Sequence, residues 1–188
     1  MKKGLLIILS GPSGVGKGTV RAMFSQNPDL NIAYSVSMTT RAKREGEVDG
    51  KDYFFVDRPT FEKAIQEGEL LEYAEFVGNY YGTPAKYVDD LRNQGKNVLL
   101  EIEVQGAQQV KEKVDDALTI FIIPPSLAEL EKRIRGRRSE DEAIIQKRLA
   151  KATKEMQLVS HYKFVVCNED PALAAQIISL IIKRHMLN

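Results

Sequence analysis

The residues with the clearest chemistry form a short glycine-rich segment after an apolar run. The segment 11–17, Gly-Pro-Ser-Gly-Val-Gly-Lys, fits the first seven positions of the P-loop pattern G-x-x-x-x-G-K. Glycines let the main chain curl so that successive N–H groups point at phosphate oxygens, and the lysine reaches the β- and γ-phosphates. The helix expected next adds partial positive charge. The predicted triphosphate-binding residues are Gly11, Pro12, Ser13, Gly14, Val15, Gly16, Lys17, Gly18 and Thr19.

The position after the lysine departs from the common pattern. Gly18 stands where a Ser or Thr is usual, and Thr19 follows one place later. Because a helix turns by about 100° per residue, Thr19 points in another direction, and position 18 offers no hydroxyl to Mg²⁺. The order Lys-Gly-Thr is similar to that of adenylate kinases, whose metal is held largely by phosphates and water. It favours a nucleoside monophosphate kinase over a GTPase or a motor ATPase and leaves a direct magnesium ligand open.

Two acids follow an apolar run further along the chain. We predict a strand over 98–104 that carries Glu101 and Glu103 on one face, about 6.6 Å apart. Ligands of α/β proteins bind at the carboxyl ends of parallel strands, so Glu101 is predicted to act on Mg²⁺, through water, and Glu103 to point into the same cleft. The alternative is an edge strand with both acids in solvent.

The elements that must position these residues alternate between strands and helices. We expect strands over 5–9, 98–104, 118–123 and 163–167, and helices over 17–27, 87–93, 127–135, 140–159 and 172–185. Capping boxes, Ser126 with Glu129 and Ser139 with Glu142, are predicted to open the third and fourth helices. The alternation predicts a parallel sheet covered by helices on both faces.

Composition narrows the class of protein. The 188 residues indicate a single domain, and 27 basic against 26 acidic residues give a net charge of +1, which argues against a general binder of nucleic acid or membrane surfaces. A single cysteine excludes an internal disulfide, and two distant histidines argue against histidine-based metal or triad chemistry. The apolar run 5–9 is too short for a membrane span, so we expect a cytoplasmic protein.

A stretch rich in Tyr, Phe, Val and Thr interrupts the α/β pattern over 34–84. It contains the segments YSVSMTTRAKR (34–44), GEVDGKDY (46–53), ELLEYA (69–74) and GNYYGT (78–83). Together with the P-loop, these segments closely resemble the guanylate kinase family, whose members phosphorylate GMP with ATP. The resemblance extends from the P-loop to the final helix.

The resemblance implies a particular architecture within the α/β class. It is a P-loop NTPase parallel sheet with helices on both faces, an inserted small β-rich GMP-binding lobe and an arginine-rich helical lid. On this interpretation 1–188 is one domain. Its core is 1–33, 85–125 and 160–188, the GMP-binding lobe is 34–84, and the lid region is 126–159.

The resemblance also implies roles for residues of the lobe. The GMP phosphate would be held by Arg41, Arg44, Tyr53 and Tyr81, and the guanine would be recognised by Ser37, Glu72, Thr83 and Glu103. Arginines and phenolic hydroxyls supply donors for a dianionic phosphate, and a carboxylate can accept from both N1–H and N2–H₂ of guanine. Glutamate stands at 101 and 103 where many family members have aspartate. The alternative is a solvated basic turn beside an aromatic lobe core.

The segment 132–138 has five basic residues in seven and belongs to the implied lid. The resemblance marks Arg133, Arg137 and Arg148 as facing the phosphates, and the implied catalytic residues are Lys17, Arg41, Arg133, Arg137 and Arg148. Asn168 is implied at the adenine edge. The attacking group would be an anionic phosphate oxygen, so no general base is needed. The implied cofactor is Mg²⁺, and the implied partners are the small molecules ATP and GMP, without nucleic acid or membrane.

Three other functions stay open on the sequence. A non-catalytic guanylate-kinase-like interaction module would typically have a degraded P-loop, whereas Lys17 and its glycines are intact here. A P-loop GTPase needs an Asn-Lys-x-Asp motif, which the segment 168–170 does not match. A monophosphate kinase for another base is disfavoured by the Tyr/Ser/Glu segments of the lobe.

Overall fold

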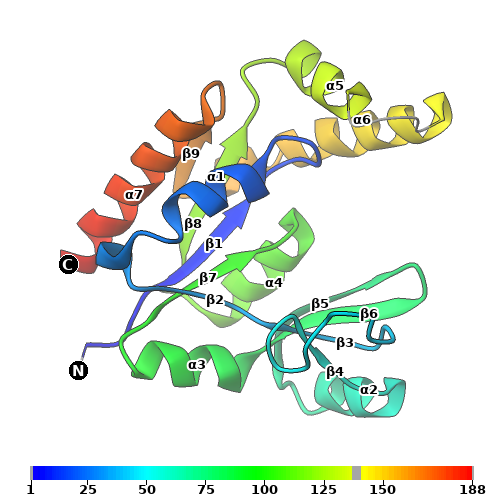
Figure 1. The fold of residues 1–188 in the computed structure, drawn as a ribbon, viewed down its shortest axis with the longest axis vertical. Coiled ribbons are helices and arrows are strands. Elements are labelled where there is room, and N and C mark those ends of the chain that lie inside the picture. The colour runs from blue at the N-terminus through cyan, green and yellow to red at the C-terminus, as the bar shows by residue number, and fades with distance from the viewer. Residues whose placement is uncertain (1, 137–140, 188) are drawn as a thin grey trace.

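The structure is a computed structural model that describes residues 2–136 and 141–187. Its strands form two separate sheets, with helices packed around them (Figure 1). The strands are β1 (Leu6–Ser10), β2 (Ile32–Tyr34), β3 (Ser37–Thr39), β4 (Tyr53–Phe55), β5 (Leu70–Phe76), β6 (Asn79–Pro84), β7 (Asn97–Glu101), β8 (Leu118–Ile123) and β9 (Phe164–Cys167). The helices are α1 (Lys17–Phe24), α2 (Arg58–Gln66), α3 (Ala85–Asn93), α4 (Val104–Lys113), α5 (Leu127–Arg135), α6 (Glu142–Met156) and α7 (Pro171–Leu187), and two 3₁₀ turns cover Pro28–Leu30 and Val159–His161.

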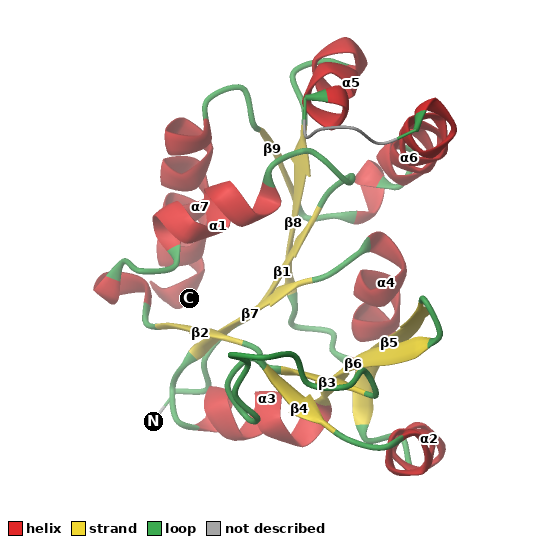
Figure 2. Ribbon diagram, turned by 45° about the vertical axis from the view of Figure 1, so that its right-hand side comes forward, coloured by secondary structure: helices red, strands yellow, loops and turns green. Residues whose placement is uncertain are grey.

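The larger sheet is parallel, with the order β2-β7-β1-β8-β9. Every residue of the central strand β1 is buried, because its alternate side chains face helices on opposite sides of the sheet. Ile7 and Leu9 pack in one cluster with α1 and α7, and Leu6 and Ile8 pack in another with α3 and α4. Figure 2 shows these helix pairs on the two faces. The predicted α/β fold class is thereby confirmed.

The smaller sheet has the order β4-β3-β6-β5 and covers part of the stretch 34–84. Its core is Phe61, Ala64 and Leu70, and the ring of Tyr80 stacks on Phe61 with centroids 5.2 Å apart. Two of these core residues come from α2, a helix that the sequence analysis did not predict. Asp57 caps it by accepting a hydrogen bond from the N–H of Thr60.

The predicted strand over 98–104 is wrong at its end. β7 ends at Glu101, and α4, which was not predicted, begins at Val104 with Glu103 at its N-cap. Glu101 and Glu103 therefore do not share a strand face. The buried residues of α4 have helical spacing and are Val104, Ala107 and Val110. Val104 also continues the apolar pattern of the strand, so the change from a strand repeat to a helix repeat is not visible in the sequence.

Several helix boundaries also differ from the prediction, including the start of α3 at Ala85 and both ends of α7 at Pro171 and Leu187. α1 ends at Phe24, three residues earlier than expected, and α6 ends at Met156 before a 3₁₀ turn. α6 begins at Glu142 with Asp141 at its N-cap, so Glu142 does not occupy the third position that the second capping box requires. The other member of that box, Ser139, lies outside the described residues.

Of the two hydrogen bonds that the first capping box requires, one forms. The Ser126 hydroxyl accepts a hydrogen bond from the N–H of Glu129 at 3.0 Å, as predicted. The Glu129 carboxylate does not return to Ser126 but accepts a hydrogen bond from Arg133 at 3.2 Å, because the arginine one turn later offers a charged donor.

Candidate active site

The loop between β1 and α1 has the backbone conformation that phosphate binding requires. Gly14 and Gly16 have φ values of 87° and 94°, in the left-handed region that glycine tolerates. A Cβ on Gly16 would also lie 2.7 Å from Asn168 Nδ2, so this position has no space for a side chain. Gly16 is the N-cap of α1 and provides no side-chain cap, which leaves the first N–H groups of the helix available to an anion.

Lys17 and Glu101 line one cleft of about 490 Å³ with Ser13, Gly14, Gly16, Gly18 and Thr19. The Lys17 ammonium donates hydrogen bonds to the loop's own carbonyl oxygens, at 2.5 Å to Gly11 and 3.4 Å to Pro12. Burial lowers the pKa of Lys17, while the carboxylates of Glu101, Glu155 and Glu103 oppose this shift. The lysine is thus curled over the loop beside three acids.

Glu101 presents one carboxylate oxygen toward the cleft. Its Oε2 pairs with Arg21 Nε at 2.7 Å, and its Oε1 would lie 3.9 Å from a Cβ on Gly18. In the described part of the chain, no three His, Cys, Asp or Glu side chains gather into a metal-binding group. One carboxylate beside a phosphate loop fits a Mg²⁺ ion that keeps most of its ligands from phosphates and water.

A second cavity of about 430 Å³ adjoins the P-loop on the side of α5. Asn168 is 2% exposed, and its amide Nδ2 donates to the carbonyl of Val15 at 2.7 Å. Arg133 Nη1 donates to the main-chain oxygen of Asn168 at 3.0 Å. Asn168 Oδ1 has no hydrogen-bond partner among the described residues, so a buried acceptor is left for another molecule.

The predicted lid arginines have different environments. Arg148 on α6 donates from Nη2 to the Ser13 hydroxyl at 3.1 Å, so this helix reaches the tip of the P-loop. Arg135 pairs instead with Glu131 and Glu142, at 2.8 and 2.6 Å. Arg137 lies outside the described residues.

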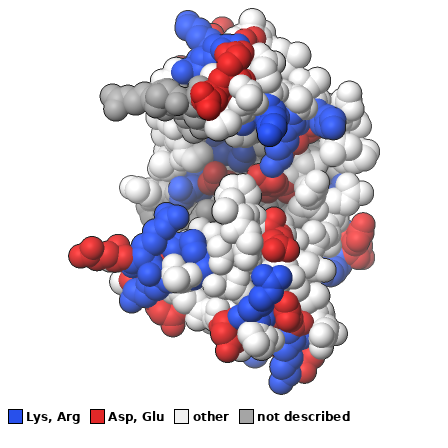
Figure 3. Space-filling view, turned by 90° about the vertical axis from the view of Figure 1, so that its right-hand side faces the viewer, with Lys and Arg blue, Asp and Glu red and all other residues white. Residues whose placement is uncertain are grey.

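A third cleft of about 450 Å³ lies between the two sheets and is lined by both polar and apolar residues. It brings together side chains that are distant in the sequence, and Figure 3 shows basic and acidic residues interspersed along the hollowed face. The predicted residues in its lining are Ser37, Tyr53, Glu72, Tyr81, Glu101 and Glu103, joined by Gln105, Gly106 and Lys151, which the sequence analysis did not single out.

Glu72 is a buried carboxylate in this cleft. It is 7% exposed, and its Oε1 accepts a hydrogen bond from the Thr83 hydroxyl at 2.6 Å across the β5–β6 pair. Burial raises the pKa of Glu72, opposed by the Thr83 hydroxyl and the charge of Lys113. Gly106 of α4 lies against it, since a Cβ there would be 2.8 Å from Glu72 Oε2. A glycine in a helix was the only sequence signal for this contact.

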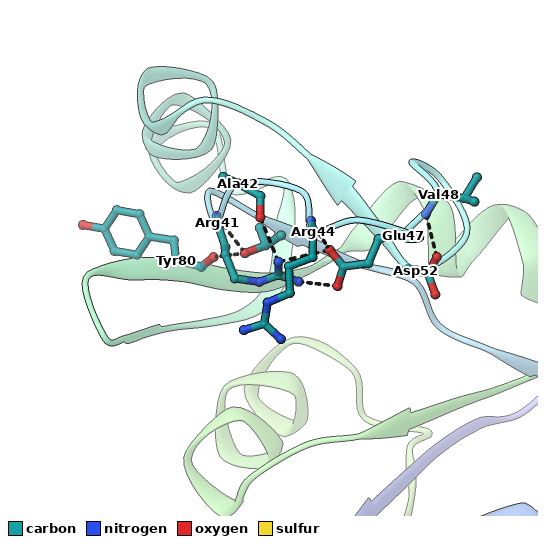
Figure 4. A network of polar contacts seen from close by, with 8 residues as sticks. Arg41, Ala42, Arg44, Glu47, Val48, Asp52 and Tyr80 are labelled. Carbon is teal, nitrogen blue, oxygen red and sulfur yellow. Dashed lines mark hydrogen bonds and ion pairs between the residues drawn. The ribbon is translucent and has the colours of Figure 1, made fainter.

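Arg41 is already paired with an acid in this structure (Figure 4). Its guanidinium makes a two-point contact with Glu47, at 3.0 and 2.6 Å, and Glu47 also accepts from the N–H of Arg44 at 2.8 Å. This pairing lowers the pKa of Glu47 and raises that of Arg41. The Tyr81 hydroxyl lies near the same guanidinium. Glu47 was not predicted as a site residue, although an acid three places after Arg44 in a basic turn was a usable signal.

A P-loop at the end of a central parallel strand, with its lysine and an acid from the neighbouring strand in one cleft, defines the chain as a P-loop NTPase. The family model described as guanylate kinase matches residues 3–184. The chain therefore belongs to the guanylate kinase family, and the resemblance found in the sequence is confirmed.

Relatives and solved structures agree with this assignment. The chain is 54% identical to the guanylate kinase of Streptococcus thermophilus (strain CNRZ 1066) over 97% of this chain and 87% of that protein. It is 54% identical to that of Enterococcus faecalis (strain ATCC 700802 / V583) over 96% and 89%. The crystal structure of guanylate kinase from Anaplasma phagocytophilum is similar with a TM-score of 0.74 and 37% identity, covering 100% of this chain and 88% of that one.

These comparisons establish an enzyme, a kinase with guanylate kinase activity that uses nucleotide substrates. A shikimate kinase from Bacteroides thetaiotaomicron is similar in fold alone, with a TM-score of 0.50 at 14% identity over 95% of this chain and 98% of that one.

Across the described ranges, the helices are all too short or too polar to cross a membrane.

Proposed function

We propose that the enzyme transfers the γ-phosphoryl group of Mg·ATP to GMP, giving ADP and GDP, with the P-loop cleft and the inter-sheet cleft as its two substrate sites. One observation carries this proposal: Glu101 lines both clefts, so the Lys17 side and the Glu72 side are contiguous. A donor phosphate and an acceptor phosphate can then meet in line beside the same strand end.

The ATP side is assigned to the loop and the elements around it. The N–H groups of residues 13–19 would surround the β- and γ-phosphates, with Lys17 leaving the Gly11 carbonyl for a phosphate oxygen. Asn168 would offer its unpaired Oδ1 to the amino group of adenine. Arg133 and Arg148 already contact the loop region and would neutralise transferring charge, together with Arg137.

Mg²⁺ is the proposed cofactor and would neutralise charge on the phosphates. Glu101 would orient it through water with Oε1, while Arg21 holds Oε2. The place of Gly18 next to Glu101 leaves room for those waters.

The GMP side is assigned to the inter-sheet cleft. Arg41, Arg44, Tyr53 and Tyr81 would hold the phosphate, and Ser37, Glu72, Thr83 and Glu103 would recognise the base. Thr83 acts through Glu72 by holding one of its oxygens, which leaves the other to accept from the guanine N–H groups. Adenine lacks those donors and would leave the second oxygen of this buried carboxylate unpaired.

The reaction needs no general base on this assignment. A phosphate oxygen of GMP, already anionic at neutral pH, bonds to the γ-phosphorus as the bond to the β–γ bridging oxygen breaks, and the electron pair leaves with ADP. The chain's contribution is to align the two phosphates and to neutralise their charge with lysine and arginines. Closure of 126–159 over the core and of 34–84 onto it would exclude water.

Arg41→Lys tests the proposed phosphate clamp. Lysine keeps the charge but cannot make the two-point contact that Arg41 makes with Glu47 and would make with a phosphate. We expect KM for GMP to rise by about 30-fold, of the order of one lost charge-assisted hydrogen bond, with KM for ATP within twofold of the wild type. Steady-state kinetics with each substrate varied would show this, and an unchanged KM for GMP would remove Arg41 from the clamp.

Gly106→Ala tests the fit of Glu72. Alanine is favoured over glycine inside a helix by about 1 kcal/mol, which offsets part of the cost of crowding Glu72, so the protein should stay folded. The added Cβ would press on Glu72 Oε2, and we expect KM for GMP to rise by about tenfold. Thermal denaturation and GMP kinetics on the same preparation check both parts, and unchanged GMP kinetics would contradict this placement of Glu72.

An ADP-release assay with ATP, Mg²⁺ and each nucleoside monophosphate in turn tests the proposed reaction. GMP-dependent turnover that is lost with EDTA supports it, and preference for another monophosphate overturns the base assignment.

We further propose a cytoplasmic enzyme that binds neither nucleic acid nor membranes. We also propose that it is divided into the core, the GMP-binding lobe and the lid region defined above.

A further inference from the structure

Glu155 is a buried acid that the proposed reaction does not use. It lies in the last turn of α6 and is 8% exposed. Its Oε2 has no hydrogen-bond partner in the described part of the chain. A carboxylate buried in this way is unfavourable unless neighbouring groups stabilise its charge. The groups around it therefore indicate what it does.

Those groups come from several elements that meet at the P-loop. The Lys151 ammonium lies 3.9 Å from Glu155 Oε1. The other groups that act electrostatically on the Glu155 carboxylate are Lys17, Glu103, Tyr162 and the main-chain N–H of Ser13. Burial raises the pKa of Glu155 with help from Glu103, and the two lysines and the Ser13 N–H oppose the shift. In return, charged Glu155 opposes the effect of burial on Lys17 and helps that lysine keep its proton.

Lys151 lies between two carboxylates. Its Nζ is 2.8 Å from Glu103 Oε2 and 3.9 Å from Glu155 Oε1, and its side chain also lines the inter-sheet cleft. Guanine that engages Glu103 would compete with Lys151 for that carboxylate. The ammonium then has a second partner one helical turn away, in Glu155.

We propose that Glu155 is a positioning residue whose buried charge steadies Lys17 and the P-loop, and that Lys151, which lies between Glu155 and Glu103, makes this effect depend on occupancy of the GMP site. The proposal rests on the proposed function, because it takes Glu103 as part of the GMP site. In the ligand-free chain Lys151 pairs with Glu103, and GMP shifts it to Glu155. The charged acid then steadies the loop as Lys17 moves from Gly11 to the phosphates.

Glu155→Gln removes the charge and keeps the shape. We expect kcat to fall by about tenfold, as for a misplaced catalytic group, and KM for GMP to rise, because Lys151 loses its second partner and competes more strongly for Glu103. In the wild type, kcat should fall as the pH drops through the raised pKa of Glu155, because the carboxylate takes up a proton. The Glu155→Gln variant should lack this fall of kcat at low pH. Glu155→Asp should recover part of kcat and also the fall of kcat at low pH. Lys154→Met, an exposed lysine of the same helix, is the matched control.

Lys151→Met tests the link between the sites without altering a buried residue. Calorimetry would measure the dissociation constant of a non-hydrolysable ATP analogue with and without GMP. We expect the two constants to differ by about fivefold in the wild type and to be equal in the variant.

Three results would overturn the inference. The first is a folded Glu155→Gln enzyme with wild-type kcat and pH profile. The second is a Lys151→Met protein in which GMP changes the dissociation constant of the ATP analogue as much as in the wild type. The third is a wild-type protein in which GMP leaves that constant unchanged. GMP-dependent turnover by the wild-type enzyme is measured in a separate assay, and its outcome tests the proposed function and not this inference.

Discussion

Replacing Lys17 by alanine is expected to reduce kcat by roughly 10³-fold or more while the protein stays folded. The ammonium is the one flexible cation of the loop itself, and removal of a preorganised charge from a phosphoryl-transfer site has effects of this order. The fold should persist, because among the described residues Lys17 donates hydrogen bonds only to the carbonyls of Gly11 and Pro12, and its side chain is not part of the apolar core.

Kinetics and circular dichroism together check this expectation. Lys63→Ala is a matched control, because Lys63 is exposed on α2 and forms a surface pair with Glu67 at 3.7 Å. The control should retain wild-type kcat. A Lys17→Ala enzyme with near-normal turnover would show that the lysine does not act on the transferred phosphoryl group.

Glu72→Gln is expected to relax the choice of base. The carboxylate accepts from both donors of guanine, whereas glutamine offers one acceptor and an NH₂ group that opposes N1–H and can donate to N1 of adenine. We expect the ratio of kcat/KM for GMP to that for AMP to fall by about 10²-fold, well within the 10⁴–10⁵ that such polar matching can supply. The Thr83 hydroxyl can still donate to the remaining oxygen, so the fold should tolerate the change.

The same residue predicts a pH effect. Because burial raises the pKa of Glu72, the neutral form becomes populated at a higher pH than for an exposed glutamate. KM for GMP should therefore rise as the pH falls through that raised value, and Glu72→Gln should show no such rise. Glu69→Gln, on an exposed side chain just before β5, is the control. Unchanged base preference in Glu72→Gln would remove this residue from the base site.

Local patterns in the sequence predicted the parallel sheet and the P-loop. The glycines at 14 and 16 permit the left-handed backbone that the loop adopts, and the apolar residues of β1 indicate a strand that is buried on both faces. β8 was predicted at its observed bounds for the same reason. Such features depend on neighbours within a few residues, so they can be inferred before any packing is known.

The pattern failed where a strand passes directly into a helix. Val104 belongs by hydrophobicity to the strand before it and by packing to α4, and only contact with the rest of the chain decides between them. The same decision places Glu103 at a helix N-cap, away from the strand face of Glu101.

The amino-acid sequence alone determined which residues can bind a triphosphate and, through family resemblance, which can recognise a guanine nucleotide. Only the tertiary structure showed how they are paired: Arg41 with Glu47, Glu72 against Gly106, and Lys151 between Glu103 and Glu155. The physical reason is that a charge on a side chain is set by its own chemistry, whereas its partner and its burial are set by elements that meet only when the two sheets and α6 have packed.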